Sequence, residues 1–238
     1  MRVDLDTGVV VGATTHGVAR FLGIPFAAPA MGANRFRLPK RMPPWSGARP
    51  AVEAAAAPSQ EKTVGVGVRG AARVSEDCLY LNVFAPTGTS LRRPVLVWIY
   101  GGGYIHGDGA DPLFDGSHLA RSQDLVVVTI NYRLGLWGFA PLVDRNVGLA
   151  DQIAALEWVA RNIAGFGGDP NNVTIAGESS GAMSVCNLLA APTAHGLFHR
   201  AIAQSGAAGN VATRAQADET ARAASDELGA SGADLAGK

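Results

Sequence analysis

The sequence contains one five-residue pattern with clear chemical potential. Residues Gly177–Gly181, which read GESSG, fit the pattern GxSxG and place Ser179 between two glycines. A short apolar run, Val173–Ala176, precedes the pattern, and a stretch with helical character follows it. A sharp turn from strand to helix strains its central residue, and the flanking glycines remove Cβ atoms that would collide. Ser179 is therefore a candidate nucleophile at a helix N-terminus, where developing negative charge is favoured.

The GxSxG pattern alone is weak evidence for a nucleophile, because glycine and serine are common. The alternative is a glycine-rich turn that contains a serine by chance. A second glycine cluster, Gly101–Gly103, directly follows the apolar run Val95–Tyr100. Its backbone amides are candidates for an oxyanion hole, in which each preorganised donor lowers the barrier by roughly 3 to 4 kcal/mol. The amide of Ser180 is the expected third donor. A phosphate-binding loop fits the cluster poorly, because it contains neither GxxxxGK[ST] nor GxGxxG.

The hydrophobic pattern around these motifs predicts an α/β fold. Near-continuous apolar runs, typical of strands buried on both faces of a largely parallel sheet, occur at Leu79–Phe84, Val95–Tyr100, Leu125–Asn131 and Val173–Ala176. Between the last two, apolar residues recur at helical spacing, with Gly165 as the expected stop. A short strand at Arg200–Gln204 and an alanine-rich helix at about Arg214–Leu228 are predicted to follow.

The N-terminal part has a different pattern. Short apolar runs from Val3 to Phe26, broken by glycines, predict antiparallel hairpins, and a proline-rich irregular stretch follows. The glycine-rich segment Val64–Gly70 is predicted to be a surface loop. At 238 residues, almost half of them hydrophobic, the chain is long enough for one substantial domain or two small ones with a buried core.

Composition restricts the partners and cofactors. Twenty Lys plus Arg balance twenty Asp plus Glu, so no strong field favours nucleic acid or an anionic membrane. The N-terminus lacks the apolar core of a secretory signal, and no apolar stretch is long enough to span a bilayer, so we expect a cytoplasmic protein. The distant cysteines Cys78 and Cys186 predict free thiols rather than a metal site or a disulfide framework. No cofactor is implied.

Several longer segments, besides the glycine motifs, match a known protein family. They are Phe21–Pro39, Glu76–Pro86, Val97–Tyr104, Asn131–Gly135, Gly148–Pro170, Phe166–Gly181 and Gly196–Gly206. In order and spacing these segments resemble the N-terminal portion of the type B carboxylesterases, the cholinesterase-like branch of the α/β-hydrolases. The resemblance implies an α/β-hydrolase with a mostly parallel central sheet, flanking helices and an N-terminal antiparallel hairpin region. It also implies that residues 1–238 are the N-terminal part of a single α/β-hydrolase domain, and that the C-terminal strands of this fold are missing from the chain.

The resemblance implies a carboxylic ester hydrolase that acts on a small-molecule ester through a serine acyl-enzyme. It implies that Ser179 is the nucleophile and that the amides of Gly102, Gly103 and Ser180 form the oxyanion hole. Glu178 matches a family carboxylate that lies near the catalytic histidine and tunes the site electrostatically.

Three further residues, an ion pair and a cysteine, have implied structural roles. Arg35 and Glu76 match a buried ion pair that organises the family fold. Cys78 matches a position that is disulfide-bonded in many members, but the upstream partner position is Ser59 in this chain. This departure implies a free thiol, in agreement with a reducing cytoplasm.

The other two members of a catalytic triad are not evident. A serine nucleophile needs a histidine to accept its proton and a carboxylate to orient that histidine. In α/β-hydrolases these groups follow in the order serine, acid, histidine. His195 and His199 follow Ser179, but no Asp or Glu lies between Ser179 and either of them.

The three earlier histidines are predicted to have other roles: His106 lines a pocket wall, and His16 and His118 lie in surface loops. The resemblance places the acid and the base beyond the end of this chain. We therefore expect a chain that carries the nucleophile and the oxyanion hole, lacks the triad acid and histidine, and has a missing C-terminal half as its partner. Without later strands, an apolar sheet edge at Arg200–Gln204 would be open, which predicts poor solubility of the chain alone.

An alternative from another class is a catalytically silent fragment or a non-enzymatic binding or scaffold protein, as in the cholinesterase-like adhesion proteins. The retained Ser179 and the intact glycine cluster favour the enzyme.

Overall fold

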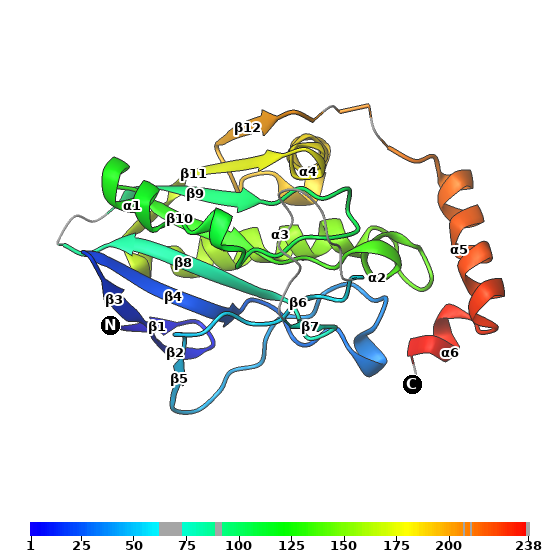
Figure 1. Ribbon diagram of the computed structural model, residues 1–238, viewed down its shortest axis with the longest axis horizontal. Helices are drawn as coiled ribbons and strands as arrows, with labels where there is room; N and C mark the ends of the chain where they lie inside the picture. Colours follow the sequence, from blue (N-terminus) through cyan, green and yellow to red (C-terminus); the bar gives the residue numbers. More distant parts are fainter. Residues whose placement is uncertain (62–72, 89–91, 207, 210, 237–238) are drawn as a thin grey trace.

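A seven-stranded sheet forms the centre of the protein (Figure 1), whose computed structural model describes residues 1–61, 73–88, 92–206, 208–209 and 211–236. Its strands, in spatial order, are β12 (Arg200–Gln204), β11 (Gly168–Glu178), β9 (Arg93–Ile99), β10 (Val126–Ile130), β8 (Tyr80–Pro86), β4 (Val18–Pro25) and β3 (Ala13–Thr15). The strands from β12 to β10 run parallel, and the pairs from β10 to β3 are antiparallel. The predicted α/β class is confirmed, and the sheet is mixed because β8 pairs antiparallel with β10.

Helices cover both faces of this sheet (Figure 1). The covering helices are α1 (Ser117–Gln123), α3 (Val147–Asn162) and α4 (Ser180–Ala190). Alternate residues of β10 face opposite sides: Val126 and Val128 join the main core with residues of α3 and α4, whereas Val127 packs with Ala120 of α1 in a second, smaller core. The two helical layers therefore exclude water from both faces, which explains the near-continuous apolar runs.

Helix α3 agrees with its predicted spacing, but it ends differently. Ala155, Leu156 and Val159 are fully buried along one side. The helix ends at Asn162, and a 3₁₀ turn, η3 (Ile163–Phe166), follows. Gly167 rather than Gly165 terminates the helical segment, because its backbone has the left-handed φ of 81° and its amide returns to the carbonyl of Ala164.

The N-terminal region contains the predicted hairpins and two small sheets. Strands β1 (Arg2–Leu5) and β2 (Gly8–Val11) are antiparallel, and β5 (Ala48–Pro50) adds to β2. The remaining elements are β6 (Ala57–Pro58), β7 (Val74–Ser75), α2 (Gly135–Phe139), α5 (Arg214–Leu228), α6 (Gly232–Ala236), η1 (Gly32–Asn34), η2 (Pro112–Phe114) and η4 (Pro192–Ala194). The predicted loop Val64–Gly70 lies outside the described residues.

Within the described ranges, no helix combines the length and apolar composition needed to cross a membrane.

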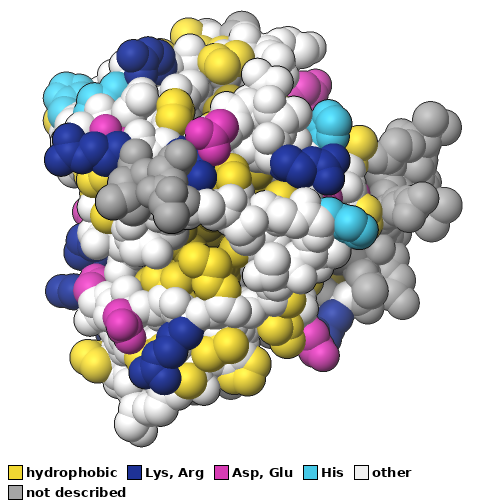
Figure 2. Space-filling view, turned by 90° about the vertical axis from the view of Figure 1, so that its left-hand side faces the viewer, with side chains coloured by type: hydrophobic (Ala, Val, Ile, Leu, Met, Phe, Trp, Pro, Cys, Tyr) yellow, Lys and Arg dark blue, Asp and Glu magenta, His cyan; other side chains and the backbone are white. Residues whose placement is uncertain are grey.

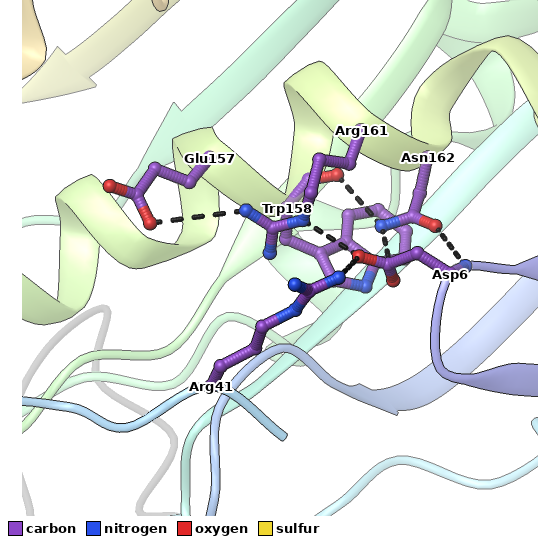
Figure 3. A network of polar contacts seen from close by, with 6 residues as sticks. All are labelled: Asp6, Arg41, Glu157, Trp158, Arg161 and Asn162. Carbon is purple, nitrogen blue, oxygen red and sulfur yellow. Dashed lines mark hydrogen bonds and ion pairs between the residues drawn. The ribbon is translucent and has the colours of Figure 1, made fainter. Parts of the chain in front are cut away.

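Asp6 connects the first hairpin to α3 (Figure 3). Its carboxylate accepts hydrogen bonds from Arg41 at 2.8 Å, Arg161 at 2.7 Å and Asn162 at 3.0 Å. The backbone amide of Asp6 in turn donates to the side-chain oxygen of Asn162. Burial alone raises the pKa of Asp6, but the hydrogen bonds from these three side chains outweigh it and hold the pKa below its ordinary value.

Candidate active site

Ser179 lies in a strained turn between β11 and α4. Its backbone has φ 54° and ψ −123°, a conformation that costs a non-glycine residue roughly 1 to 3 kcal/mol. The surroundings hold this conformation from both sides. The amide of Ser179 donates to the carbonyl of Gln204 in β12 at 2.9 Å, and its carbonyl accepts from the amide of Met183 in α4 at 3.0 Å. The turn therefore places Ser179 at the carboxyl end of a strand and at the N-terminus of an eleven-residue helix.

The glycines of the GxSxG pattern are required by close backbone approach. A Cβ on Gly181 would overlap the carbonyl oxygen of Ile99 in β9, and a Cβ on Gly177 would lie 2.8 Å from the same oxygen. A Cβ on Gly177 would also lie 2.5 Å from the carbonyl of Gly181. Because real Cβ contacts are longer, only glycine lets α4 start this close to β9 and β11. This packing explains the strand–turn–helix geometry that the spacing of the glycines predicted.

The glycine loop after β9 lies against this turn. A Cβ on Gly101 would be 3.0 Å from the Cβ of Ser179 and 2.6 Å from the carbonyl oxygen of Glu178. Gly102 and Gly103 follow with φ of 115° and 64°, values that favour glycine. No described residue accepts a hydrogen bond from the amide of Gly102 or Gly103. The structure thus brings the two glycine motifs together, about 75 residues apart in the chain.

The side chain of Ser180 ties the loop to the helix. Ser180 is 1% exposed, and its Oγ accepts a hydrogen bond from the amide of Tyr104 at 3.3 Å. The hydroxyl of Tyr132 donates to the carbonyl of Tyr100, directly after β9, at 2.8 Å. The bond between Tyr104 and Ser180 therefore connects the glycine loop with α4.

A second set of contacts fixes Tyr104 itself. Its carbonyl accepts from the amide of Gly135 at 2.7 Å, and its hydroxyl accepts from Ser184 at 3.2 Å. Ser184 is in turn bonded to Gln152 of α3. Sequence reasoning missed this network, although hydroxyl and amide side chains within apolar helical runs were a signal of buried polar contacts.

The segment that holds Tyr104 is anchored by a buried ion pair, which sequence reasoning also missed. Arg133 and Asp151 have side chains that are 4% and 0% exposed. Asp151 accepts from Nε of Arg133 at 2.8 Å, from Nη2 at 2.6 Å and from the backbone amide at 3.0 Å. This pair fixes the chain between β10 and α2 against α3, and Gly135 follows two residues later.

Glu178 and His106 lie beside the glycine loop, whereas His199 contacts Val173 of β11. Glu178 is exposed, and its Oε2 would be 2.9 Å from a Cβ on Gly101, so the carboxylate lies beside the glycine loop. His106 packs against Gly102, and its backbone amide donates to the carbonyl of Gly102 at 3.2 Å. His199 accepts a hydrogen bond from the amide of Val173 at 3.2 Å, which fits its predicted structural role. No hydrogen bond joins any described residue to the hydroxyl of Ser179.

The implied ion pair and the implied free cysteine are both present in the structure. Nε of Arg35 donates to Glu76 at 2.7 Å, with both side chains largely buried, and the Arg35 guanidinium also reaches the carbonyl of Leu235 in α6. Cys78 is buried and free, and Cys186 is free and half-buried. Burial raises the pKa of the Cys78 thiol, so this thiol is not a candidate nucleophile.

Among the described residues, no group of three or more His, Cys, Asp or Glu side chains is placed to hold a metal ion.

The fold and the site define the class of protein. A strained serine lies between a strand and a helix, and a glycine loop lies beside it at the same sheet, which is the arrangement of the α/β-hydrolases. A model of the Carboxylesterase family matches residues 1–236, and the chain belongs to this family.

Individual relatives agree with this assignment. The chain is 45% identical over 234 residues to the para-nitrobenzyl esterase of Bacillus subtilis (strain 168), a match that covers 95% of this chain and 48% of that protein. It is 47% identical over 231 residues to the liver carboxylesterase of Sus scrofa, and this match covers 88% of this chain and 40% of that protein. A solved thermophilic PNB esterase is similar with a TM-score of 0.94 and 44% identity, over 99% of this chain and 50% of that chain. The chain therefore spans about half the length of the relatives that it matches.

Proposed function

We propose that this chain provides the nucleophile and the oxyanion hole of a serine carboxylic ester hydrolase. The observation that carries the proposal is the contact between two motifs: Ser179, at φ 54° between β11 and α4, lies against the glycine loop that begins at Gly101. Neither motif alone specifies acyl transfer, but their proximity supports the proposal that a nucleophilic oxygen and oxyanion-stabilising amides act together here.

In the proposed reaction, Oγ of Ser179 attacks the ester carbonyl and the alcohol leaves, which forms an acyl-enzyme. The amides of Gly102, Gly103 and Ser180 donate to the oxyanion of each tetrahedral intermediate, and the N-terminus of α4 adds its dipole. Water then attacks the acyl-enzyme and releases the acid. Glu178, beside the glycine loop, adds a negative field that favours an imidazolium nearby.

The base and the orienting acid are proposed to come from the half of the relatives that this chain does not match. The described histidines support this division, because none of them hydrogen-bonds Ser179. A serine hydrolase without its histidine loses about a million-fold in turnover, so the chain alone should be nearly inactive. A scaffold role without catalysis is less well supported, since nothing about a scaffold requires the strain at Ser179.

The proposed substrate is a small-molecule carboxylic ester, in agreement with the esterases among the relatives. No nucleic acid, membrane or cofactor is required by this chemistry. A cytoplasmic location stays a prediction, supported by the free thiols of Cys78 and Cys186.

A complementation experiment tests the proposal. The chain is joined to the C-terminal half of the Bacillus subtilis para-nitrobenzyl esterase, and hydrolysis of p-nitrophenyl acetate is measured. We expect activity in the folded hybrid, loss of that activity in Ser179→Ala, and full activity in the surface control Ser122→Ala. A folded hybrid whose activity survives Ser179→Ala would contradict the proposal. Strong labelling of Ser179 by a fluorophosphonate in the chain alone would contradict the assignment of the base to the missing half.

A further inference from the structure

A basic pocket lies far from the esterase site, between the β3–β4 hairpin and α1. It has a volume of about 380 Å³ and is lined by Thr15, His16, Val18, Arg20, Asp115, Ser117, His118 and Arg121. Strand β3 is the edge strand opposite β12, so this pocket is at the other side of the sheet from the turn at Ser179. Figure 2 shows histidine and arginine or lysine side chains close together on this side of the molecule.

The charge of the pocket is positive. Asp115, the single carboxylate among the described lining residues, already has partners: Oδ2 accepts from Arg20 at 2.8 Å, and Oδ1 accepts from the amide of Ser117 at 2.8 Å. Arg121 makes no ion pair with a described residue. The guanidinium of Arg121 and the rings of His16 and His118 therefore remain as donors, and their chemistry suits an oxyanion.

A metal ion is a poorer fit to the same residues. The described part of the chain holds no group of three or more ligating side chains, and Asp115, the carboxylate of the pocket, is neutralised by Arg20. A dianion with several terminal oxygens matches the surplus of N–H donors better.

The walls of the pocket are preorganised. His16 and Gly17 are the central residues of a two-residue hairpin turn, with φ of 49° and 77°, as in a type I′ turn. The carbonyl of Gly17 accepts from both the amide and the hydroxyl of Thr87, which fixes the turn. On the opposite wall, His118 and Arg121 are three residues apart on α1 and share one side of that helix.

An unused hydroxyl adds to the donors. Oγ of Ser117 is buried and has no hydrogen-bond partner among the described residues. A polar group in this state costs roughly 1 to 3 kcal/mol, and it can rotate toward a ligand without losing an existing bond.

We propose that this pocket binds a phosphate group, either as free inorganic phosphate or as a small phosphate monoester. Arg121 donates to two phosphate oxygens with its planar fork, and the rings of His16 and His118 donate from the two walls. The volume exceeds the space of one tetrahedral ion, so the pocket also has room for the organic part of a monoester. The proposal is independent of the esterase site.

A calorimetric titration tests the proposal. The purified hybrid protein is titrated with inorganic phosphate and, separately, with phenyl phosphate at constant ionic strength. We expect saturable binding of at least one of the two, and at least a tenfold higher Kd in Arg121→Gln, since the charge-assisted contact of the guanidinium with two phosphate oxygens is lost. His118→Gln is a second variant with the same expected direction. Arg145→Gln, which removes an exposed cation paired with Asp218 elsewhere on the surface, is the matched control and should leave Kd unchanged.

The two ligands distinguish the sources of the phosphate. Tighter binding of phenyl phosphate would assign the pocket to a monoester, and equal or tighter binding of inorganic phosphate would assign it to the free ion. Absence of saturable binding at millimolar concentrations would overturn the proposal. An equal rise of Kd in Arg121→Gln and Arg145→Gln would also overturn it, because the effect would then be one of net charge.

Discussion

The backbone amide of Tyr104 donates a hydrogen bond to Oγ of Ser180 over 3.3 Å. This bond joins the glycine loop to the first residue of α4, so a side chain ties together the two segments that carry the candidate oxyanion amides. Because Ser180 is 1% exposed, water cannot replace its hydroxyl without a rearrangement. The relative position of the amides therefore depends on a group that itself needs no contact with substrate.

Replacing this hydroxyl should reduce turnover more than substrate binding. Ser180→Ala keeps the backbone amide but removes the hydrogen bond to Tyr104. We expect kcat of the hybrid enzyme to fall about tenfold, equal to about 1.4 kcal/mol, with little change in KM. Steady-state hydrolysis of p-nitrophenyl acetate measures both values, and Ser180→Thr, which restores a hydroxyl, should recover part of kcat. An unchanged kcat in Ser180→Ala would show that the amides are held by other contacts.

The close approach of α4 to β9 should make Gly181 irreplaceable. In Gly181→Ala the new methyl group would overlap the carbonyl oxygen of Ile99, so α4 must move or the strand must bend. We expect the free energy of unfolding to fall by about 3 kcal/mol, measured by urea denaturation. Gly209→Ala is the control, because nothing lies within 4 Å of a Cβ at that position. Equal midpoints for the two variants would refute the packing argument.

The buried pair of Arg133 and Asp151 should be sensitive to loss of one charge. Asp151→Asn leaves the guanidinium buried without its counter-charge, and such a change costs about 3 to 5 kcal/mol. Thermal or urea unfolding checks the loss. The exposed pair of Arg145 and Asp218 provides the comparison: Asp218→Asn should cost less than about 1 kcal/mol. Similar losses in both variants would mean that burial does not distinguish these pairs.

Asp6 should make the protein sensitive to acid. Its pKa in the folded protein lies below the ordinary value of 3.8, so its contribution to stability is present above that value and is lost as the pH falls through the folded pKa. Asp6→Asn should lower the free energy of unfolding by about 1 to 3 kcal/mol at pH 7. Denaturation at pH 7 and pH 3 should show the difference between wild type and variant shrinking at the lower pH.

A neighbouring carboxylate provides the control for this test. Asp4→Asn removes an exposed acid of the same hairpin that makes no ion pair with a described residue. Its stability difference should be small at both pH values. A difference for Asp6→Asn that stays constant between pH 7 and pH 3 would disprove the role of its ionised form.

The edge strand β12 should promote association of the chain on its own. All five of its residues are exposed, and Ile202 is 46% exposed on a strand that pairs only with β11 among the described strands. We expect sedimentation of the chain to depend on concentration and Ile202→Lys to reduce this association. Leu113→Lys, which changes an exposed leucine outside the sheet, should have little effect. A monodisperse chain with a cooperative melting transition would contradict the expectation.

Local patterns in the sequence were sufficient for most of the architecture. The strand Arg200–Gln204 and the helix Arg214–Leu228 have the predicted bounds, because each is delimited by glycine or capping residues close in sequence. The short helix α1 was missed, since its seven residues carry only one buried side chain, Ala120, and therefore no periodic signal. The antiparallel direction of β8 was also not predicted, because an apolar run gives burial but not the direction of the neighbouring strand.

The sequence by itself determined that a serine lies between two glycines at a strand–helix junction, and that a glycine cluster follows another strand. These features are local, so chain order specifies them. Only the tertiary structure decided that Gly101 contacts Ser179, that Ser180 bonds Tyr104, and that Arg133 pairs with Asp151, because each contact joins elements brought together by the packing of α3, α4 and β9. The pocket at His16 and Arg121 has the same origin: its walls are about a hundred residues apart and meet only across the sheet.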